Sequence, residues 1–130
     1  MSRLLLDTNI FLWMQTEPHR LGSLRSIIED ESTELFLSPA SSWEIAIKWG
    51  LGKLPLPEPP ETYVPSRMLA AQVQSLPITH FHTLAVAALP DHHRDRFDRL
   101  LIAQSRTESL SLASADPLIR PYGIDLIAPT

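Results

Sequence analysis

The sequence predicts an α/β fold with a parallel central sheet, and three observations support this prediction. Its strand-like runs are short and apolar: RLLL at 3–6 and LFL at 35–37 are too brief for helices and fit strands buried on both faces. Segments with helix caps or helical spacing separate such runs, and this alternation is typical of parallel sheets. The chain has 130 residues, which fits a single domain over 1–130.

The N-terminal elements follow one another closely. After the first strand, Thr8 and Asn9 are both residues that cap helices well, and they are expected to start a helix that reaches about Gln15. Because two good caps follow it, Asp7 is not expected to be needed as a cap. A second helix is expected over 21–30, ahead of the strand at 35–37.

The Ser-Pro pair at 38–39 is expected to open a third helix, since serine caps helices and proline suits the first helical position. This helix continues through ASSWEIAIKW and stops at Gly50 or Gly52. The proline-dense run LPLPEPPETYVP follows, and we interpret it as a rigid connector inside the domain. Segment 55–90 is expected to form a helical flap or insertion that shapes substrate choice or dimer contacts, with helices over 62–74 and 80–88 and a strand near 76–78.

The last third of the chain contains the clearest amphipathic helix, over 94–107, whose apolar positions include 97, 100, 101 and 103 on one side. A strand is expected over 110–113 and a final one over 124–127. Between them, the Asp-Pro pair at 116–117 is expected to open a helical turn.

Composition limits the cellular setting. The chain has no cysteine, which excludes disulfides and thiolate metal sites and fits a reducing compartment. The apolar run near the N-terminus ends at Asp7, which is too early for a signal peptide or a membrane span. We therefore expect a cytoplasmic protein with no membrane association.

The net charge of −4 is unlike that of a protein that holds nucleic acid by bulk attraction. An RNA substrate would require local compensation of this charge, either by bound divalent cations or by basic residues of a partner.

Two acidic residues lie just beyond predicted strands. Asp7 follows the first strand directly, and Asp116 follows the strand at 110–113 within three residues. Each has an ordinary alternative as a turn residue or a helix cap, and for Asp116 the cap and a functional role are compatible. Sites of parallel α/β sheets form beyond the carboxyl ends of the strands, which favours a functional reading of both residues.

Two further acidic residues lie on predicted helices. Glu44 is the one acid of the SSWEIAIK helix, and an ordinary alternative is that it pairs with Lys48. However, a helix that is apolar nearly all round is expected to be buried. A buried acid in it therefore favours a functional role. Asp98 lies beside an apolar stripe and has Arg94 as an alternative partner. For Asp98 the two interpretations carry equal weight.

Together the four acids suggest a cation site. Carboxylates gathered at one end of a sheet raise each other's pKa values, and a divalent cation relieves this repulsion. Oxygen ligands without cysteine or a paired histidine motif suit Mg²⁺ or Mn²⁺. Such a cation can activate water for hydrolysis of a phosphodiester, and Ser114 can hydrogen-bond a carboxylate or that water.

Four motifs follow one another along the chain, namely LLLDTN, SSWEIAIK, HRDRFDRLLIAQ and ASADPLI. In this order the sequence resembles the PIN-domain family, and within it the VapC toxins of toxin–antitoxin pairs, over about residues 3–127. The resemblance implies a parallel sheet of about five strands flanked by helices and an endoribonuclease dependent on Mg²⁺ or Mn²⁺. It also implies a homodimer and a VapB-like antitoxin as partner.

Carried over residue by residue, the resemblance assigns the catalytic acids as Asp7, Glu44, Asp98 and Asp116. Of these, Asp7, Asp98 and Asp116 are expected to bind the metal. Asn9 and Ser114 are the expected supporting polar residues. From the sequence itself, Arg96 and Arg99 are expected to contact RNA phosphates because they flank Asp98.

Three alternatives remain open at this stage. A PIN-fold nuclease that processes RNA without being a toxin has the same acids. A non-catalytic interaction module would use the fold without a bound metal. A phosphoryl-transfer enzyme or phosphate receiver would use Asp7 as the phosphoacceptor, but the acidic partner expected at position 9 is replaced by Asn9.

Overall fold

The computed structural model describes residues 2–130 and contains a five-stranded sheet in the order β3-β2-β1-β4-β5. Every neighbouring pair of strands is parallel, so the predicted parallel α/β fold is confirmed. The strands are β1 (Arg3–Leu6), β2 (Glu34–Leu37), β3 (Val73–Ser75), β4 (Ser111–Ala113) and β5 (Leu126–Ile127).

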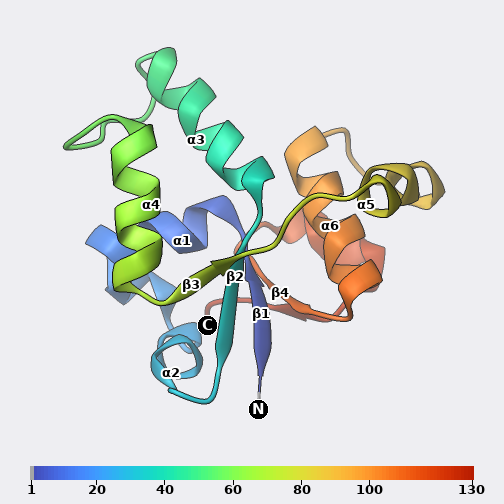
Figure 1. Cartoon of the computed structure of the whole chain (residues 1–130). Helices are drawn as coiled ribbons and strands as arrows, with labels where there is room; N and C mark the ends of the chain where they lie inside the picture. The colour runs from blue at the N-terminus through green and yellow to red at the C-terminus, as the bar shows by residue number, and fades with distance from the viewer. Residues whose placement is uncertain (1) are drawn as a thin grey trace.

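Helices cover both faces of the sheet (Figure 1). Along β1, Leu4 and Leu6 are completely buried in one core, whereas Leu5 between them is buried in the other. The first core packs against α1 (Thr8–Thr16), η1 (Pro18–Leu21), α2 (Leu24–Glu29), α3 (Pro39–Gly50) and α4 (Pro60–Ala70). The second packs against α5 (His80–Ala85), η2 (Val86–Ala88), α6 (Arg96–Glu108) and η3 (Pro117–Tyr122). Burial of both faces explains why the strands are short apolar runs.

Strand β1 is the switch point of the sheet. The chain passes from β1 to β2 and β3 on one side, and then returns to pair β4 with β1 on the other side. Ligand sites of open α/β sheets lie at the carboxyl ends of the strands at such a reversal. The fold therefore places the ends of β1 and β4 where a site is expected.

Several predicted boundaries are wrong. The helix expected over 62–74 ends at Ala70, and the strand expected near 76–78 lies at Val73–Ser75 instead. Gln72 has a φ of 56° between them, and a left-handed residue ends a helix without any glycine to signal it. The helix expected over 21–30 is likewise divided into η1 and α2, with Gly22 at a φ of 53° between them.

Segment 55–90 contributes more than a helical flap. It holds α4 and α5, but it also supplies β3, which pairs with β2 and forms one edge of the sheet. A role of this segment in substrate choice stays a prediction.

Helix α3 is not buried as its sequence suggests. It extends beyond the carboxyl end of the sheet beside α4 (Figure 1). Three of its large apolar side chains and that of Leu51, its C-cap, are exposed. The exposed fractions are 64% for Trp43, 38% for Ile47, 41% for Trp49 and 63% for Leu51. The apolar face that the sequence suggested was core is therefore surface in the isolated chain.

Among residues 2–130, no helix is both long enough and apolar enough to cross a membrane.

Candidate active site

Asp7 lies at the end of β1, where its backbone N–H donates a hydrogen bond of 2.9 Å to the carbonyl of Ala113 in β4. Asp7 is also the N-cap of α1, and its Oδ1 accepts a hydrogen bond of 2.8 Å from the N–H of Thr8. The expectation that Thr8 or Asn9 takes the cap is wrong, because the helix already begins at Thr8. Capping fixes one oxygen of Asp7 and turns the carboxylate toward the end of β4.

Ser114 connects the two strand-end acids. Its hydroxyl donates a hydrogen bond of 2.6 Å to Oδ2 of Asp7 and accepts one of 3.1 Å from the backbone N–H of Asp116. Ser114 is completely buried. Asp116 caps η3 by accepting a 2.9 Å hydrogen bond from the N–H of Leu118, so its cap role and its position at the site coexist as expected.

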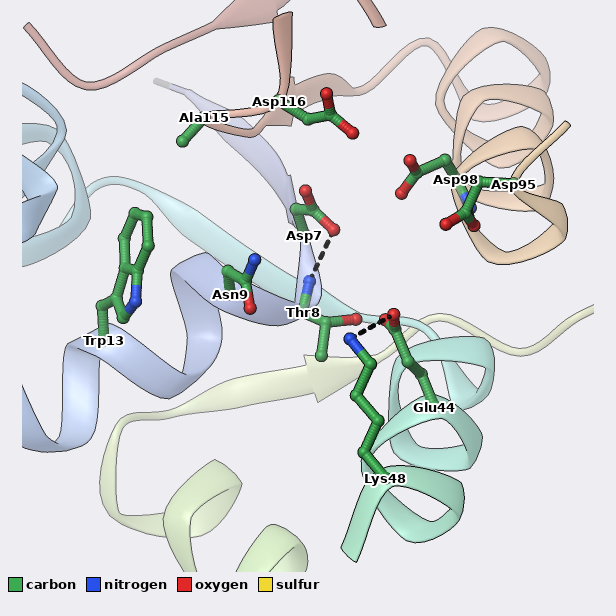
Figure 2. A pocket seen from close by; sticks show the side chains of 10 residues that line it. All are labelled: Asp7, Thr8, Asn9, Trp13, Glu44, Lys48, Asp95, Asp98, Ala115 and Asp116. Carbon is green, nitrogen blue, oxygen red and sulfur yellow. Dashed lines mark hydrogen bonds and ion pairs between the residues drawn. The ribbon is translucent and has the colours of Figure 1, made fainter. Parts of the chain in front are cut away.

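Asp98 enters from the first turn of α6. Asp95 caps this helix, accepting a 2.9 Å hydrogen bond from the N–H of Asp98. The side chain of Asp98 faces Asp7 and Asp116 across the site (Figure 2), and Asp98 is only 9% exposed. Its Oδ2 lies 3.2 Å from Nε2 of His93, whereas the partner considered from the sequence was Arg94.

Glu44 faces the same space from α3, and its carboxylate forms an ion pair of 3.1 Å with Lys48 one turn later. The ordinary i,i+4 pair is therefore present, and Glu44 still contributes to the site. Its side chain is 14% exposed, although Trp43 and Ile47 on the same helix are exposed.

These side chains line one cavity of about 370 Å³, within the size range of small-ligand sites (Figure 2). All four predicted acids and Asn9 line it. The remaining lining residues are Thr8, Trp13, Lys48, Asp95 and Ala115. Asp95 and Lys48 were not assigned to the site from the sequence, since a helix cap and an i,i+4 partner are ordinary in themselves.

Burial and mutual repulsion keep two of the acids from ionising freely. Desolvation, together with the charges of Asp7 and Asp95 and the contact with Asp116, raises the pKa of Asp98 to about 8. Desolvation also raises the pKa of Asp7, although the hydrogen bonds from Ser114 and Thr8 oppose that shift. Carboxyl groups held in this way are typical of sites that bind a cation.

The donor atoms fit a divalent cation. His93, Asp98 and Asp116 offer potential ligand atoms that all lie within 4.8 Å of one another. Thr8, which also lines the cavity, has a buried hydroxyl oxygen with no hydrogen-bond partner among residues 2–130. A buried oxygen without a partner is costly, and a bound ion or its water would satisfy it.

The two arginines flanking Asp98 do not line the cavity. Arg96 is exposed on α6. The guanidinium of Arg99 instead donates hydrogen bonds to the carbonyl of Pro90 at 2.9 Å and to the hydroxyl of Tyr122 at 3.0 Å. A role for either residue in RNA binding stays a prediction.

A second groove of about 430 Å³ continues from the cavity past Trp13, Ala115 and Asp116. It carries two arginines, Arg20 and Arg120, and its walls include Pro117, Leu126, Ala128 and Pro129. The guanidinium of Arg20 lies 4.1 Å from the centre of the Trp13 ring. No local sequence pattern indicates this groove, because η1, η3 and the C-terminal segment meet only in the folded chain.

Part of the chain is similar in sequence to a known ribonuclease. A segment of 74 residues is 43% identical to ribonuclease VapC16 of Mycobacterium tuberculosis, and it spans 51% of this chain and 52% of that protein. The chain therefore spans about half the length of this curated relative.

Two solved structures share the fold over nearly the whole chain. VapBC2 from Rickettsia felis, bound to a promoter DNA fragment, matches with a TM-score of 0.71 at 12% identity, covering 98% of both chains. DNA-bound VapBC from Salmonella typhimurium matches with a TM-score of 0.71 at 14% identity, again covering 98% of both chains. At these identities the likeness concerns the fold. Residues 4–122 match the PIN domain family, and the chain belongs to that family.

Proposed function

We propose that this protein is a metal-dependent endoribonuclease and the toxin of a VapBC-type toxin–antitoxin pair. The observation that carries the proposal is the convergence of Asp7, Glu44, Asp98 and Asp116 on one cavity at the switch point of the sheet. The likeness to a VapC ribonuclease over half of the chain supports the activity. The likeness in fold to VapBC chains supports the toxin assignment.

Asp7, Asp98 and Asp116 would hold the cation, for which Mg²⁺ or Mn²⁺ is the best match to an oxygen-rich donor set. When bound, such an ion supplies an activated water and stabilises negative charge on a phosphodiester. The chain itself orients the ligands: Thr8 and Ser114 fix the carboxylate of Asp7, and Asp95 fixes the first turn of α6 below Asp98. Glu44, held by Lys48, completes the acidic wall as a base for the attacking water.

The groove beside the cavity would hold the RNA strand on one side of the scissile bond. Arg120 offers charge to phosphates, and Pro117 offers a flat surface to bases. Arg20 adds positive charge, but it pairs with Glu17 at 3.4 Å and lies over the Trp13 ring. The groove therefore has local positive charge, although the net charge of the whole chain is −4.

The exposed α3 surface, formed by Trp43, Ile47 and Trp49 of α3 and by its C-cap Leu51, supports a protein partner. We propose that the VapB-like antitoxin and a second copy of the chain, as a homodimer, both bind the protein, and that the exposed α3 surface serves one of these contacts. A cysteine-free chain fits the cytoplasm as the compartment where it would act.

The rival role of Asp7 as a phosphoacceptor fits the site less well. Asp7 is 8% exposed, and both of its oxygens already accept hydrogen bonds from Thr8 and Ser114. An oxygen buried in this way is poorly placed to attack a phosphodonor. A PIN-fold nuclease that processes RNA without being a toxin is distinguished by the neighbouring reading frame, which for a toxin encodes a small DNA-binding protein.

The activity is tested by incubating the purified protein with single-stranded RNA and Mg²⁺ or Mn²⁺. Cleavage should stop on addition of EDTA, and Asp98→Asn should lower its rate by about 10²-fold or more, the scale of losing one catalytic group. Asp91→Asn is the matched control, because it removes the same charge from an exposed residue outside the cavity. Undiminished cleavage by the Asp98→Asn protein would refute the proposal.

A further inference from the structure

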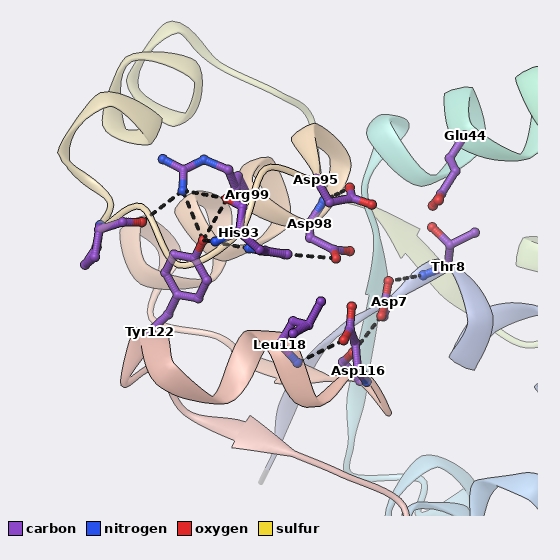
Figure 3. A network of polar contacts seen from close by, with 12 residues as sticks. Asp7, Thr8, Glu44, His93, Asp95, Asp98, Arg99, Asp116, Leu118 and Tyr122 are labelled. Atoms are coloured by element: carbon purple, nitrogen blue, oxygen red, sulfur yellow. Dashed lines mark hydrogen bonds and ion pairs between the residues drawn. The ribbon is translucent and has the colours of Figure 1, made fainter.

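His93 lies between the acidic cavity and a partly buried hydrogen-bond network around Tyr122 (Figure 3). Its side chain is 8% exposed. One ring nitrogen, Nε2, lies 3.2 Å from Oδ2 of Asp98, and the other, Nδ1, lies 2.7 Å from the hydroxyl of Tyr122. The ring therefore links an acid of the site to η3. Which ring nitrogen carries the hydrogen decides whether Nε2 can donate a hydrogen bond to Asp98 or offer a lone pair to a cation.

The hydrogen bonds around Tyr122 decide that question. The hydroxyl oxygen accepts from Nη1 of Arg99 at 3.0 Å and from the backbone N–H of His93 at 3.3 Å. A phenol has two lone pairs and one proton, so these two donors occupy its acceptor sites. Its proton must then go to an acceptor. Nδ1 of His93 at 2.7 Å is much closer than the carbonyl of His93, which lies at 3.5 Å.

When Nδ1 accepts a hydrogen bond from the Tyr122 hydroxyl, the hydrogen of the neutral ring is on Nε2, which faces Asp98. A neutral ring with its hydrogen on Nε2 has no lone pair to offer on the side of the cavity.

We propose that His93 is a positioning residue whose Nε2–H donates to Asp98, and that Arg99 and Tyr122 fix this tautomer. This proposal rests on the proposed function, since it assigns His93 to the same cation site. His93 would hold one oxygen of Asp98 and thereby turn the carboxylate toward Asp116 and Asp7. Second-layer hydrogen bonds of this kind orient ligands and raise metal affinity.

In the competing assignment, His93 is a direct metal ligand together with Asp98 and Asp116. The potential ligand atoms of these three residues lie within 4.8 Å of one another. A ligating Nε2 has no hydrogen, so Nδ1 would carry it and donate to Tyr122. The hydroxyl would then accept three hydrogen bonds and direct its own proton at the distant carbonyl of His93. The two assignments therefore place the ring hydrogen on opposite nitrogens.

The test is ¹⁵N NMR of the histidine rings in the full chain, without RNA, before and after addition of Mg²⁺, with His93→Gln used to assign the signals. We expect Nδ1 of His93 to be unprotonated and Nε2 protonated in both states. Protonated Nδ1, or loss of the Nε2 hydrogen when Mg²⁺ is added, would overturn the proposal in favour of direct ligation.

Metal affinity, measured by calorimetry, provides a second readout. Tyr122→Phe keeps the buried ring but removes the hydroxyl, and it should lower Mn²⁺ affinity by about tenfold, the lower end of the usual second-layer effect. His93→Gln keeps an N–H donor near Asp98 and should remain within about threefold of wild type, whereas His93→Ala should lose roughly 10- to 100-fold. Equal losses for Gln and Ala would also overturn the proposal.

Neither readout involves RNA cleavage. A protein that has the expected tautomer and binds metal but does not cut RNA would contradict the proposed function and leave the assignment of His93 intact. A protein that cuts RNA but has the opposite tautomer would contradict the assignment of His93 and leave the proposed function intact.

Discussion

The hydroxyl of Ser114 donates a hydrogen bond of 2.6 Å to Oδ2 of Asp7 and so joins the ends of β4 and β1 at the acidic cavity. This bond stabilises the ionised form of Asp7 and opposes the desolvation that raises its pKa. Ser114→Ala should therefore raise the pKa of Asp7 further and lower metal affinity by roughly 10- to 100-fold, the range for lost outer-layer bonds.

Calorimetry with Mn²⁺ measures this effect, and two variants control for packing. Ser114→Thr keeps the hydroxyl and should bind the metal nearly as well as wild type. Ser105→Ala removes another buried serine hydroxyl, which donates a hydrogen bond of 2.6 Å to the carbonyl of Leu110. Ser105 does not line the acidic cavity. If Ser105→Ala lowered metal affinity as much as Ser114→Ala, the effect would be one of folding rather than of the site.

The pH dependence of metal binding follows from Asp98. Because desolvation and neighbouring acids raise its pKa to about 8, the metal-free protein keeps this proton at neutral pH and must release it to bind a cation. Affinity for Mg²⁺ should rise by about tenfold per pH unit between pH 6 and 8 and level off above 8. A flat affinity over this interval would contradict the shift.

The stability of the metal-free protein should have the opposite dependence. The folded state holds the Asp98 proton up to about pH 8, whereas the unfolded chain loses it near the ordinary value of 3.8. Between these values the folded state binds more protons, so the free energy of unfolding falls as pH rises. Thermal unfolding from pH 5 to 8 measures this decline, which should be shallower in Asp98→Asn because that side chain cannot ionise.

Much of the site could be predicted from the sequence because its key acids follow local signals. Asp7 and Asp116 come directly after short apolar strands, and the rule that sites form at the carboxyl ends of parallel strands brings them together. The cap at Asp116 was visible in the Asp-Pro pair. Glu44 was assigned from its apolar surroundings, although the helix around it is largely exposed, and Asp98 was assigned mostly from the order of motifs.

What the sequence missed depends on contacts between distant segments. The position of His93 beside Asp98 requires Tyr122, which is 29 residues away, to hold the ring. Local patterns do not contain such a contact. The left-handed Gln72 shifted β3. The exposure of α3 could not be predicted, because large apolar side chains occur on protein surfaces as well as in cores.

The groove beside the cavity gives a prediction for RNA binding. Arg120→Ala should weaken binding of a single-stranded RNA oligonucleotide and reduce the slope of log affinity against log salt by about 0.7, the value for one phosphate contact on a single strand. Arg25→Ala is the matched control, because it removes the same charge from α2 where Arg25 pairs with Glu29. Equal effects of the two changes would show only a change in overall charge.

Gln104 gives a prediction for stability that leaves the chemistry untouched. Its buried amide donates hydrogen bonds to the carbonyls of Leu76 at 3.2 Å and Pro77 at 3.4 Å, and thereby holds α6 against the segment after β3. Gln104→Ala leaves these carbonyls unpaired and should lower the free energy of unfolding by about 1–3 kcal/mol. Denaturant titration measures the loss. Gln74→Ala, at an exposed glutamine on β3, should change it by less than about 0.5 kcal/mol.

The central claim is that the acids at the ends of β1 and β4 and on α6 hold one divalent cation. Calorimetric titration of Mn²⁺ into wild-type protein and into the Asp98→Asn and Asp116→Asn variants tests it most directly, with Asp91→Asn as the control for charge. We expect one site in wild type and in the control, and at least about 100-fold weaker binding in the other two variants, since each loses a direct ligand. Equal Mn²⁺ affinity in all four proteins would contradict it.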